Sequence, residues 1–219
     1  MLFRSLLLHE PYVRLYPAQV IKQPDLVLAM QWRSHEFTDD EKARNVDYYE
    51  RRTVRDSSLS ACTQAVMCAE VGHLELAHAY TREAALIDLR DLHHNTRDGL
   101  HMASLAGTWT ALVAGFGGLR DDEHILSLDP ALPEEISRLK FGIHWRKYRL
   151  AAEVDHREVT YTLRDGPDGK LTIRHAGDEL TLTTKTPTTV GLRTRTALLP
   201  TPEQPSGRAP RRHIERAEP

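Results

Sequence analysis

The chain has 219 residues, a formal net charge of −2 and a pI near 6.6, values that argue against a nucleic-acid-binding protein. No apolar stretch is long enough to span a membrane, and the opening MLFRSLLLHEP lacks the small-residue cleavage site of a signal peptide. Cys62 and Cys68 lie six residues apart in one helical pattern, which indicates free thiols rather than a disulfide framework. We therefore expect a cytoplasmic protein that binds neither nucleic acid nor membrane.

The first part of the chain has the periodicity of helices. The apolar segment LVLAMQW follows Pro24, which suits a helix start. Thr38 with Glu41 forms the capping-box pattern that opens DDEKARNVDYYERR. Another apolar run begins among three serines, so we expect a helix to begin near Ser57 or Ser58.

Two further helical segments follow. LELAHAYTREAALID has one apolar stripe, formed by Ala77, Tyr80, Ala84 and Ile87. LHMASLAGTWTALVAGFGGL is apolar on nearly every side, which is typical of a helix buried all round. The chain encodes too few partners to cover such helices, so we expect either oligomerisation or further parts of the domain outside this chain, and an exposed apolar face on the chain alone.

The second part of the chain changes period. Apolar residues alternate with polar or small ones in three segments, at Leu139, Phe141, Ile143 and Trp145, at Leu150, Ala152 and Val154, and at Val159, Tyr161 and Leu163. The turn sequence DGPDG and two more short strand patterns, KLTIRH and ELTLTT, follow. This spacing predicts a small antiparallel β-sandwich. Residues 193–219 are rich in proline and arginine, and we expect them to be disordered.

The serine cluster after Arg55 and Asp56 has two readings. It can be an ordinary helix cap, or it can be a cradle for an anion at a helix N-terminus. Taken alone, the cluster favours the cap, and a single histidine such as His101 is more often a structural group than a ligand. No histidine or cysteine pattern has the spacing of a metal site, so no metal is expected.

Three blocks of sequence resemble one known family. QVIKQPDLVLAM, ARNVDYYERRTVRDSSLSACTQAVMCAEVGHLELAHAY and NTRDGLHMASLAGTWTALVAGFGGL resemble the C-terminal part of glycoside hydrolase family 65, the family of maltose, trehalose and kojibiose phosphorylases. The resemblance runs from about Tyr12 to Leu192. It implies an α+β chain in which residues 1–122 form part of an (α/α)6 barrel and residues 123–192 a small C-terminal antiparallel β-sandwich, with 193–219 as the disordered tail.

The resemblance also implies a reaction and a site. The family cleaves α-glucosyl disaccharides with inorganic phosphate as co-substrate, with inversion and without a cofactor. Phosphate is already an anionic nucleophile, so an anion site replaces the general base of an inverting hydrolase. The matching residues are Lys22 and Gln23 for the glucosyl unit and, for phosphate, Ser57, Ser58, Gly99 and His101. Asp56 and Asp98 lie within the same blocks and would repel phosphate if ionised nearby.

The general-acid glutamate of the family lies upstream of the Lys-Gln block, so no catalytic residue is assigned within this chain. One hypothesis is that the chain forms part of an active disaccharide phosphorylase together with a separately encoded N-terminal piece. The expected partners are then disaccharide, phosphate and, in a homo-oligomer, a second copy of the chain. The alternative is a non-catalytic remnant that binds phosphate or sugar weakly. An upstream reading frame that encodes the missing barrel would favour the first.

Overall fold

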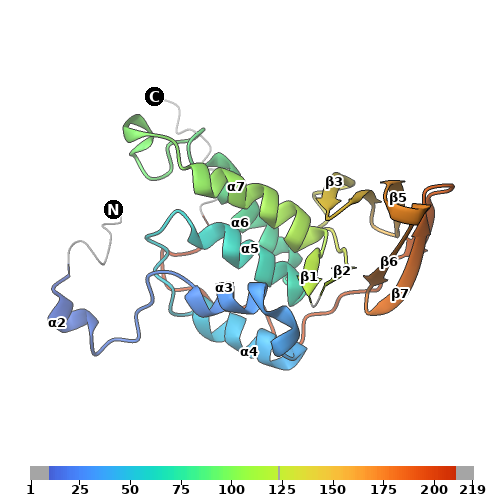
Figure 1. Ribbon diagram of the computed structural model, residues 1–219. Helices are drawn as coiled ribbons and strands as arrows, with labels where there is room; N and C mark the ends of the chain where they lie inside the picture. Colours follow the sequence, from blue (N-terminus) through green and yellow to red (C-terminus); the bar gives the residue numbers. More distant parts are fainter. Residues whose placement is uncertain (1–9, 123, 211–219) are drawn as a thin grey trace. The chain divides into compact units, whose positions relative to one another are not determined.

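The computed structural model describes residues 10–122 and 124–210, and these form two compact units (Figure 1). The helical unit contains the described residues up to Ala111 together with residues 197–210, and the β unit contains the described residues from Leu112 to Thr196. The described residues are thus both helical and β, as expected for an α+β chain. No helix among them has the length and apolar character needed to cross a bilayer.

The helices of the helical unit lie in the part of the sequence that has helical periodicity. Its elements are α2 (Tyr12–Leu15), α3 (Asp25–Trp32), a 3-10 turn (Ser34–Glu36), α4 (Asp39–Glu50), α5 (Ser60–Glu70), α6 (Leu74–Leu86), a second 3-10 turn (Thr96–Asp98) and α7 (Met102–Thr110) (Figure 1). The capping box that opens α4 is confirmed. The Glu41 N–H donates to Thr38 Oγ1 over 3.3 Å, and the Thr38 N–H donates to Glu41 Oε2 over 2.9 Å.

The helices pack through the faces that the periodicity predicts. The α6 stripe is fully buried, at Ala77, Tyr80, Ala84 and Ile87. At the contact of α5 with α7, a Cβ on Gly107 would lie 2.5 Å from Cys62 Sγ, so this close approach requires glycine. Both cysteines are free thiols, Cys68 buried and Cys62 partly so.

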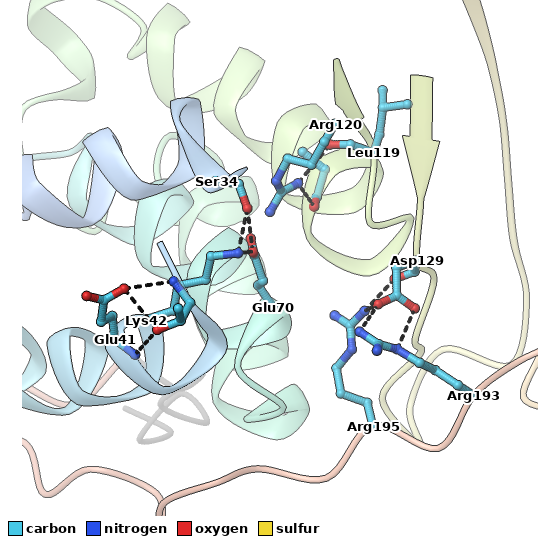
Figure 2. Close-up of polar contacts among 11 residues, drawn as sticks. Ser34, Glu41, Lys42, Glu70, Leu119, Arg120, Asp129, Arg193 and Arg195 are labelled. Atoms are coloured by element: carbon cyan, nitrogen blue, oxygen red, sulfur yellow. Dashed lines mark hydrogen bonds and ion pairs between the residues drawn. The ribbon is translucent and has the colours of Figure 1, made fainter. Parts of the chain in front are cut away.

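Lys42 joins α4 to its neighbours through one hydrogen bond and one ion pair. Lys42 on α4 donates to Ser34 Oγ over 2.7 Å and to Glu70 Oε1, on α5, over 2.6 Å (Figure 2). Its side chain is only 9% exposed, and that of Glu70 17%. The pair therefore fixes the end of α5 against α4 within a largely desolvated contact.

The apolar helices leave part of their surface uncovered. Val27 and Met30 of α3 are buried, but Trp32 is 71% exposed. On α7, Met102 is 68% exposed and Trp109 54%. The expectation of an exposed apolar face on the helical part of this chain is confirmed for the described residues.

A π-helical segment (Ala111–Phe116) leads into the β unit, which continues in strands. These are β1 (Arg120–Asp122), β2 (Ile125–Leu128), β3 (Leu139–Trp145), β4 (Tyr148–Val154), β5 (Glu158–Asp165), β6 (Lys170–His175), β7 (Asp178–Thr183) and β8 (Thr188–Gly191). Within the described residues they form two four-stranded sheets, ordered β1-β2-β6-β7 and β3-β4-β5-β8. Tyr161 on β5 hydrogen-bonds His175 Nδ1 on β6 over 3.0 Å and so links the two sheets.

The prediction of an antiparallel unit is right for most pairs and wrong for one. The strands β2 and β6 pair in parallel, with Ser127 opposite Arg174. Period-2 alternation identifies a strand and its buried face, but it carries no information about the direction of a partner far along the chain. The buried faces of the other strands agree with the predicted alternation, as at Leu150, Val154, Val159, Tyr161 and Leu163.

Residues 193–210, part of the segment expected to be disordered, make specific contacts in the structure. Asp129 forms ion pairs with Arg193 and, over 2.7 Å, with Arg195 (Figure 2). Residues 197–210, which we call the C-terminal strap, then return to the helical unit. They make specific side-chain hydrogen bonds there through Gln204 and Arg208. Composition predicted disorder because these contacts use polar side chains rather than an apolar core. Residues 211–219 lie outside the described residues.

Candidate functional site

One β-bridge joins the segment that leads into Lys22 and Gln23 to the segment that leads toward the serine cluster. Ile21 and Thr53 form a parallel bridge, in which the Val54 N–H donates to Ile21 O over 2.8 Å. The two segments leave this bridge in the same direction because it is parallel. Lys22 is exposed and Gln23 half-buried.

The serines lie in a turn before α5 and do not cap it. The helix begins at Ser60, close to the expected start near Ser57 or Ser58, but its N-cap is Leu59, which has no side-chain capping bond, so neither serine caps it. Instead, Ser57 Oγ accepts from the Leu59 N–H over 3.3 Å. The Ser58 hydroxyl is half-buried and makes no hydrogen bond within the described part of the chain. A partly shielded hydroxyl at a helix start is compatible with a ligand contact.

Arg55 bends the chain into the serine turn. Its φ of 59° lies in the left-handed region, which costs free energy for a residue with a side chain. The conformation is held by the guanidinium, which pairs with Glu83 on α6 and lies 4.5 Å from the centroid of the Tyr80 ring. Both members of the ion pair are almost fully buried, with side-chain exposures of 6% and 8%.

His101 is held by Asp88. The His101 N–H donates to Asp88 Oδ2 over 2.8 Å, and His101 Nδ1 lies 2.6 Å from Asp88 Oδ1. The hydrogen bond from the His101 ring lowers the pKa of Asp88, so the carboxylate is ionised at neutral pH and Nδ1 is the donor. This arrangement fixes the ring and makes Nε2 the nitrogen that can meet a ligand.

Gly99 precedes His101 in the loop that leads to α7. It has a φ of 138°, and a Cβ added there would meet no atom within 4 Å. Glycine is therefore required by the backbone conformation rather than by crowding. The loop presents an open stretch of backbone next to His101.

The serine turn and His101 lie at the same end of the helical unit. Glu83, near the end of α6, contacts Arg55 just before the turn, whereas Asp88, just after α6, contacts His101 at the N-cap of α7. These two anchor points are five residues apart in the sequence, on either side of the last residue of α6. The N-terminal ends of α5 and α7 are thus both placed at the C-terminal end of α6. Hydroxyls, a histidine nitrogen and helix N-terminal N–H groups are suited to an anion.

Asp56 brings a negative charge next to the serines. Its carboxylate Oδ1 lies 2.8 Å from Arg208 Nη1, on the C-terminal strap. The supporting residues Asp88, Glu83 and Arg208 were not predicted from the sequence. Each of them is too far from its partner in the sequence for a local pattern to reveal the contact. Asp88 lies 13 residues from His101, Glu83 28 residues from Arg55 and Arg208 152 residues from Asp56.

Known families and proteins match this chain over most of its length. The model of the glycosyl hydrolase family 65 central catalytic domain matches residues 3–110, and that of the family's C-terminal domain matches residues 119–182. An uncharacterized glycosyl hydrolase of Mycobacterium leprae is 74% identical over 210 residues, which cover 95% of this chain and 26% of that protein. The α,α-trehalose phosphorylase of Geobacillus stearothermophilus is 41% identical over 187 residues, or 83% of this chain and 24% of the relative.

A solved structure agrees with these matches. A human-microbiome protein provisionally described as a kojibiose phosphorylase superposes with a TM-score of 0.78 at 31% identity, over 85% of this chain and 25% of its own. The chain thus spans about a quarter of the length of the curated relatives quoted above.

Proposed function

Because the chain belongs to glycosyl hydrolase family 65, we propose that it forms the C-terminal part of a disaccharide phosphorylase and supplies the phosphate side of its site. Trehalose and kojibiose phosphorylases are among its relatives, which favours an α-glucosyl disaccharide as substrate. The observation that carries the proposal is the placement of the serine turn and His101 at one end of α6.

Each residue has a role in this proposal. Ser57, Ser58 and the backbone at Gly99 bind the phosphate, and His101 Nε2 contacts one of its oxygens. Lys22 and Gln23, which directly follow the bridge residue Ile21, hydrogen-bond the glucosyl unit. Phosphate attacks the anomeric carbon directly, so the site needs no general base.

The domain assignment is part of the same proposal. Residues 1–122 contribute to a helical barrel, residues 123–192 form the small β domain, and the general acid comes from the part of the barrel upstream of Lys22. The exposed apolar faces of α3 and α7 would then contact barrel helices, or a second copy of the chain. The protein would act in the cytoplasm, on disaccharide and inorganic phosphate.

The test is complementation. The chain is co-expressed with the part of the Mycobacterium leprae relative that precedes the matched region, and glucose 1-phosphate is measured with trehalose, kojibiose or maltose plus phosphate. We expect activity from the pair and none above a mock preparation from the chain alone, since general-acid assistance contributes about 10²- to 10⁴-fold in rate. Activity of the chain alone would contradict the placement of the acid outside it. Phosphate binding without turnover by the pair would favour a non-catalytic remnant.

Variants of the active pair test the residue roles. Ser58→Ala and His101→Ala are expected to raise KM for phosphate more than KM for the disaccharide. Ser206→Ala, at an exposed strap position, is the control. Equal effects on both KM values would refute the phosphate assignment.

A further inference from the structure

The C-terminal strap is bound directly to the segment that leads into the serine turn. Arg208 Nη1 donates to Val54 O and to Asp56 Oδ1, each over 2.8 Å. The Arg55 guanidinium donates back to the carbonyl oxygen of Arg208. The strap thus contacts three successive residues immediately before Ser57.

The Arg208–Asp56 pair has an electrostatic consequence. Asp56 is adjacent to Ser57, and its side chain is only 10% exposed, against 19% for Arg208. An unpaired carboxylate with so little solvent screening would repel a phosphate held by the neighbouring serines. The guanidinium of Arg208 removes this obstacle and leaves the hydroxyls and N–H groups free to attract the anion.

A second anchor holds the strap in place. Gln204 donates to Glu50 Oε2 over 3.0 Å and also contacts the Tyr80 hydroxyl, which itself donates to Glu50 over 2.6 Å. Burial raises the pKa of Glu50; Gln204 and Tyr80 donate to its Oε2, and Gln64 donates to Oε1, so both oxygens are satisfied inside the helical unit. Because the Tyr80 ring also lies against the guanidinium of Arg55, the same network supports the left-handed residue of the turn.

We propose that the C-terminal strap is a positioning element of the anion site, in which Arg208 neutralises Asp56 and fixes the turn that presents Ser57 and Ser58. The proposal rests on the proposed function for the identity of the anion. Arg208 is a positioning residue, since it acts through Asp56 and the backbone of the turn. Phosphate affinity then depends on a segment about 150 residues away from the serines in sequence.

The experiment measures two properties of the 219-residue chain. Binding of inorganic phosphate is measured by titration, and amide hydrogen exchange is measured over residues 55–60. The variants are Arg208→Ala, the milder Arg208→Gln, Asp56→Asn, the double variant Arg208→Ala/Asp56→Asn, and Ser206→Ala as the strap control. Circular dichroism verifies the helix content of each.

We expect Arg208→Ala to weaken phosphate binding about tenfold, since it exposes the anion to one nearby like charge. The double variant should recover most of that affinity, because Asp56→Asn removes the repulsion, and a purely structural role for Arg208 would not produce this rescue. Exchange over residues 55–60 should rise in both Arg208 variants and stay unchanged in Ser206→Ala.

Unchanged affinity and exchange in Arg208→Ala would overturn the proposal, and so would a folded double variant without rescue. If Arg208→Ala loses helix content, Arg208→Gln decides by the same criteria. If the wild-type chain and Asp56→Asn both fail to bind phosphate, the anion site of the proposed function is overturned. In that case raised exchange in the Arg208 variants would still support the strap's effect on the turn, and unchanged exchange would refute it.

Discussion

Replacement of Asp88 by asparagine tests the carboxylate that holds His101. The side chain of Asp88 is 6% exposed and that of His101 16%, so solvent screens their contact weakly. Asparagine keeps the shape and one acceptor oxygen, but its amide nitrogen cannot accept a hydrogen bond. The backbone N–H of His101 keeps an acceptor oxygen, whereas Nδ1–H loses its charged acceptor and is paired again only if the imidazole changes tautomer and accepts from the amide.

The magnitude follows from the two contacts, at 2.8 and 2.6 Å. A hydrogen bond to a charged group contributes about 1.5–3 kcal/mol, and a buried donor left unsatisfied costs about 1–3 kcal/mol. With one of the two bonds preserved, we expect Asp88→Asn to lower the free energy of unfolding of the helical unit by about 2–3 kcal/mol at pH 7.

The loss should depend on pH with a definite sign. The folded-state pKa of Asp88 lies below its ordinary value, chiefly because the His101 ring hydrogen-bonds to it. Its contribution is then complete above the unfolded pKa, about 3.9, and decreases as the pH falls through the folded pKa. The difference between wild type and Asp88→Asn should therefore shrink as the pH falls below about pH 4.

The assay is urea denaturation followed by far-ultraviolet circular dichroism at pH 7 and at lower pH values. Asp98→Asn is the matched control, because Asp98 lies in the same loop and its side chain is 72% exposed. If Asp88→Asn costs no more than Asp98→Asn at pH 7, the reasoning is refuted. A loss that persists unchanged at low pH would show that the carboxylate charge is not its cause.

Two further predictions concern the scaffold of the helical unit. Lys42→Met removes the ammonium group from its buried contact with Glu70 and should lower the free energy of unfolding, measured in urea, by about 3 kcal/mol. Arg44→Met, in an exposed ion pair of the same helix, should lower it by about 0.5 kcal/mol or less. Equal losses in the two variants would contradict the role of burial. The apolar surface at Met102 and Trp109 should make the isolated chain associate and bind a hydrophobic dye. Trp109→Glu should reduce both the association and the dye binding. A monodisperse wild-type monomer that binds no dye would contradict this prediction.

Local patterns predicted the elements whose causes are local. The capping box at Thr38 and Glu41 depends on side chains three residues apart, and the α6 stripe depends on a 3.6-residue period. Both were confirmed for that reason. The strand segments 139–145, 148–154 and 158–165 were likewise visible from a two-residue period.

Features that depend on distant partners were not predictable in this way. The parallel pairing of β2 with β6 is a choice between remote strands, and nothing in Ile125–Leu128 encodes it. The contacts of the strap were hidden by a composition typical of disorder. In the candidate site, the resemblance to family 65 selected the serines and His101. The residues that hold them, Asp88 and Arg208, became visible only in three dimensions.

The return of the chain to the helical unit has a consequence for the order of folding during synthesis. A ribosome makes residues 10–111 before the whole β unit, and it makes the C-terminal strap after that unit. Until Gln204 and Arg208 emerge, Glu50 and Asp56 lack these partners from the strap. The nascent helical unit is therefore expected to stay open at the serine turn while the β unit folds, and to close once the strap has been translated.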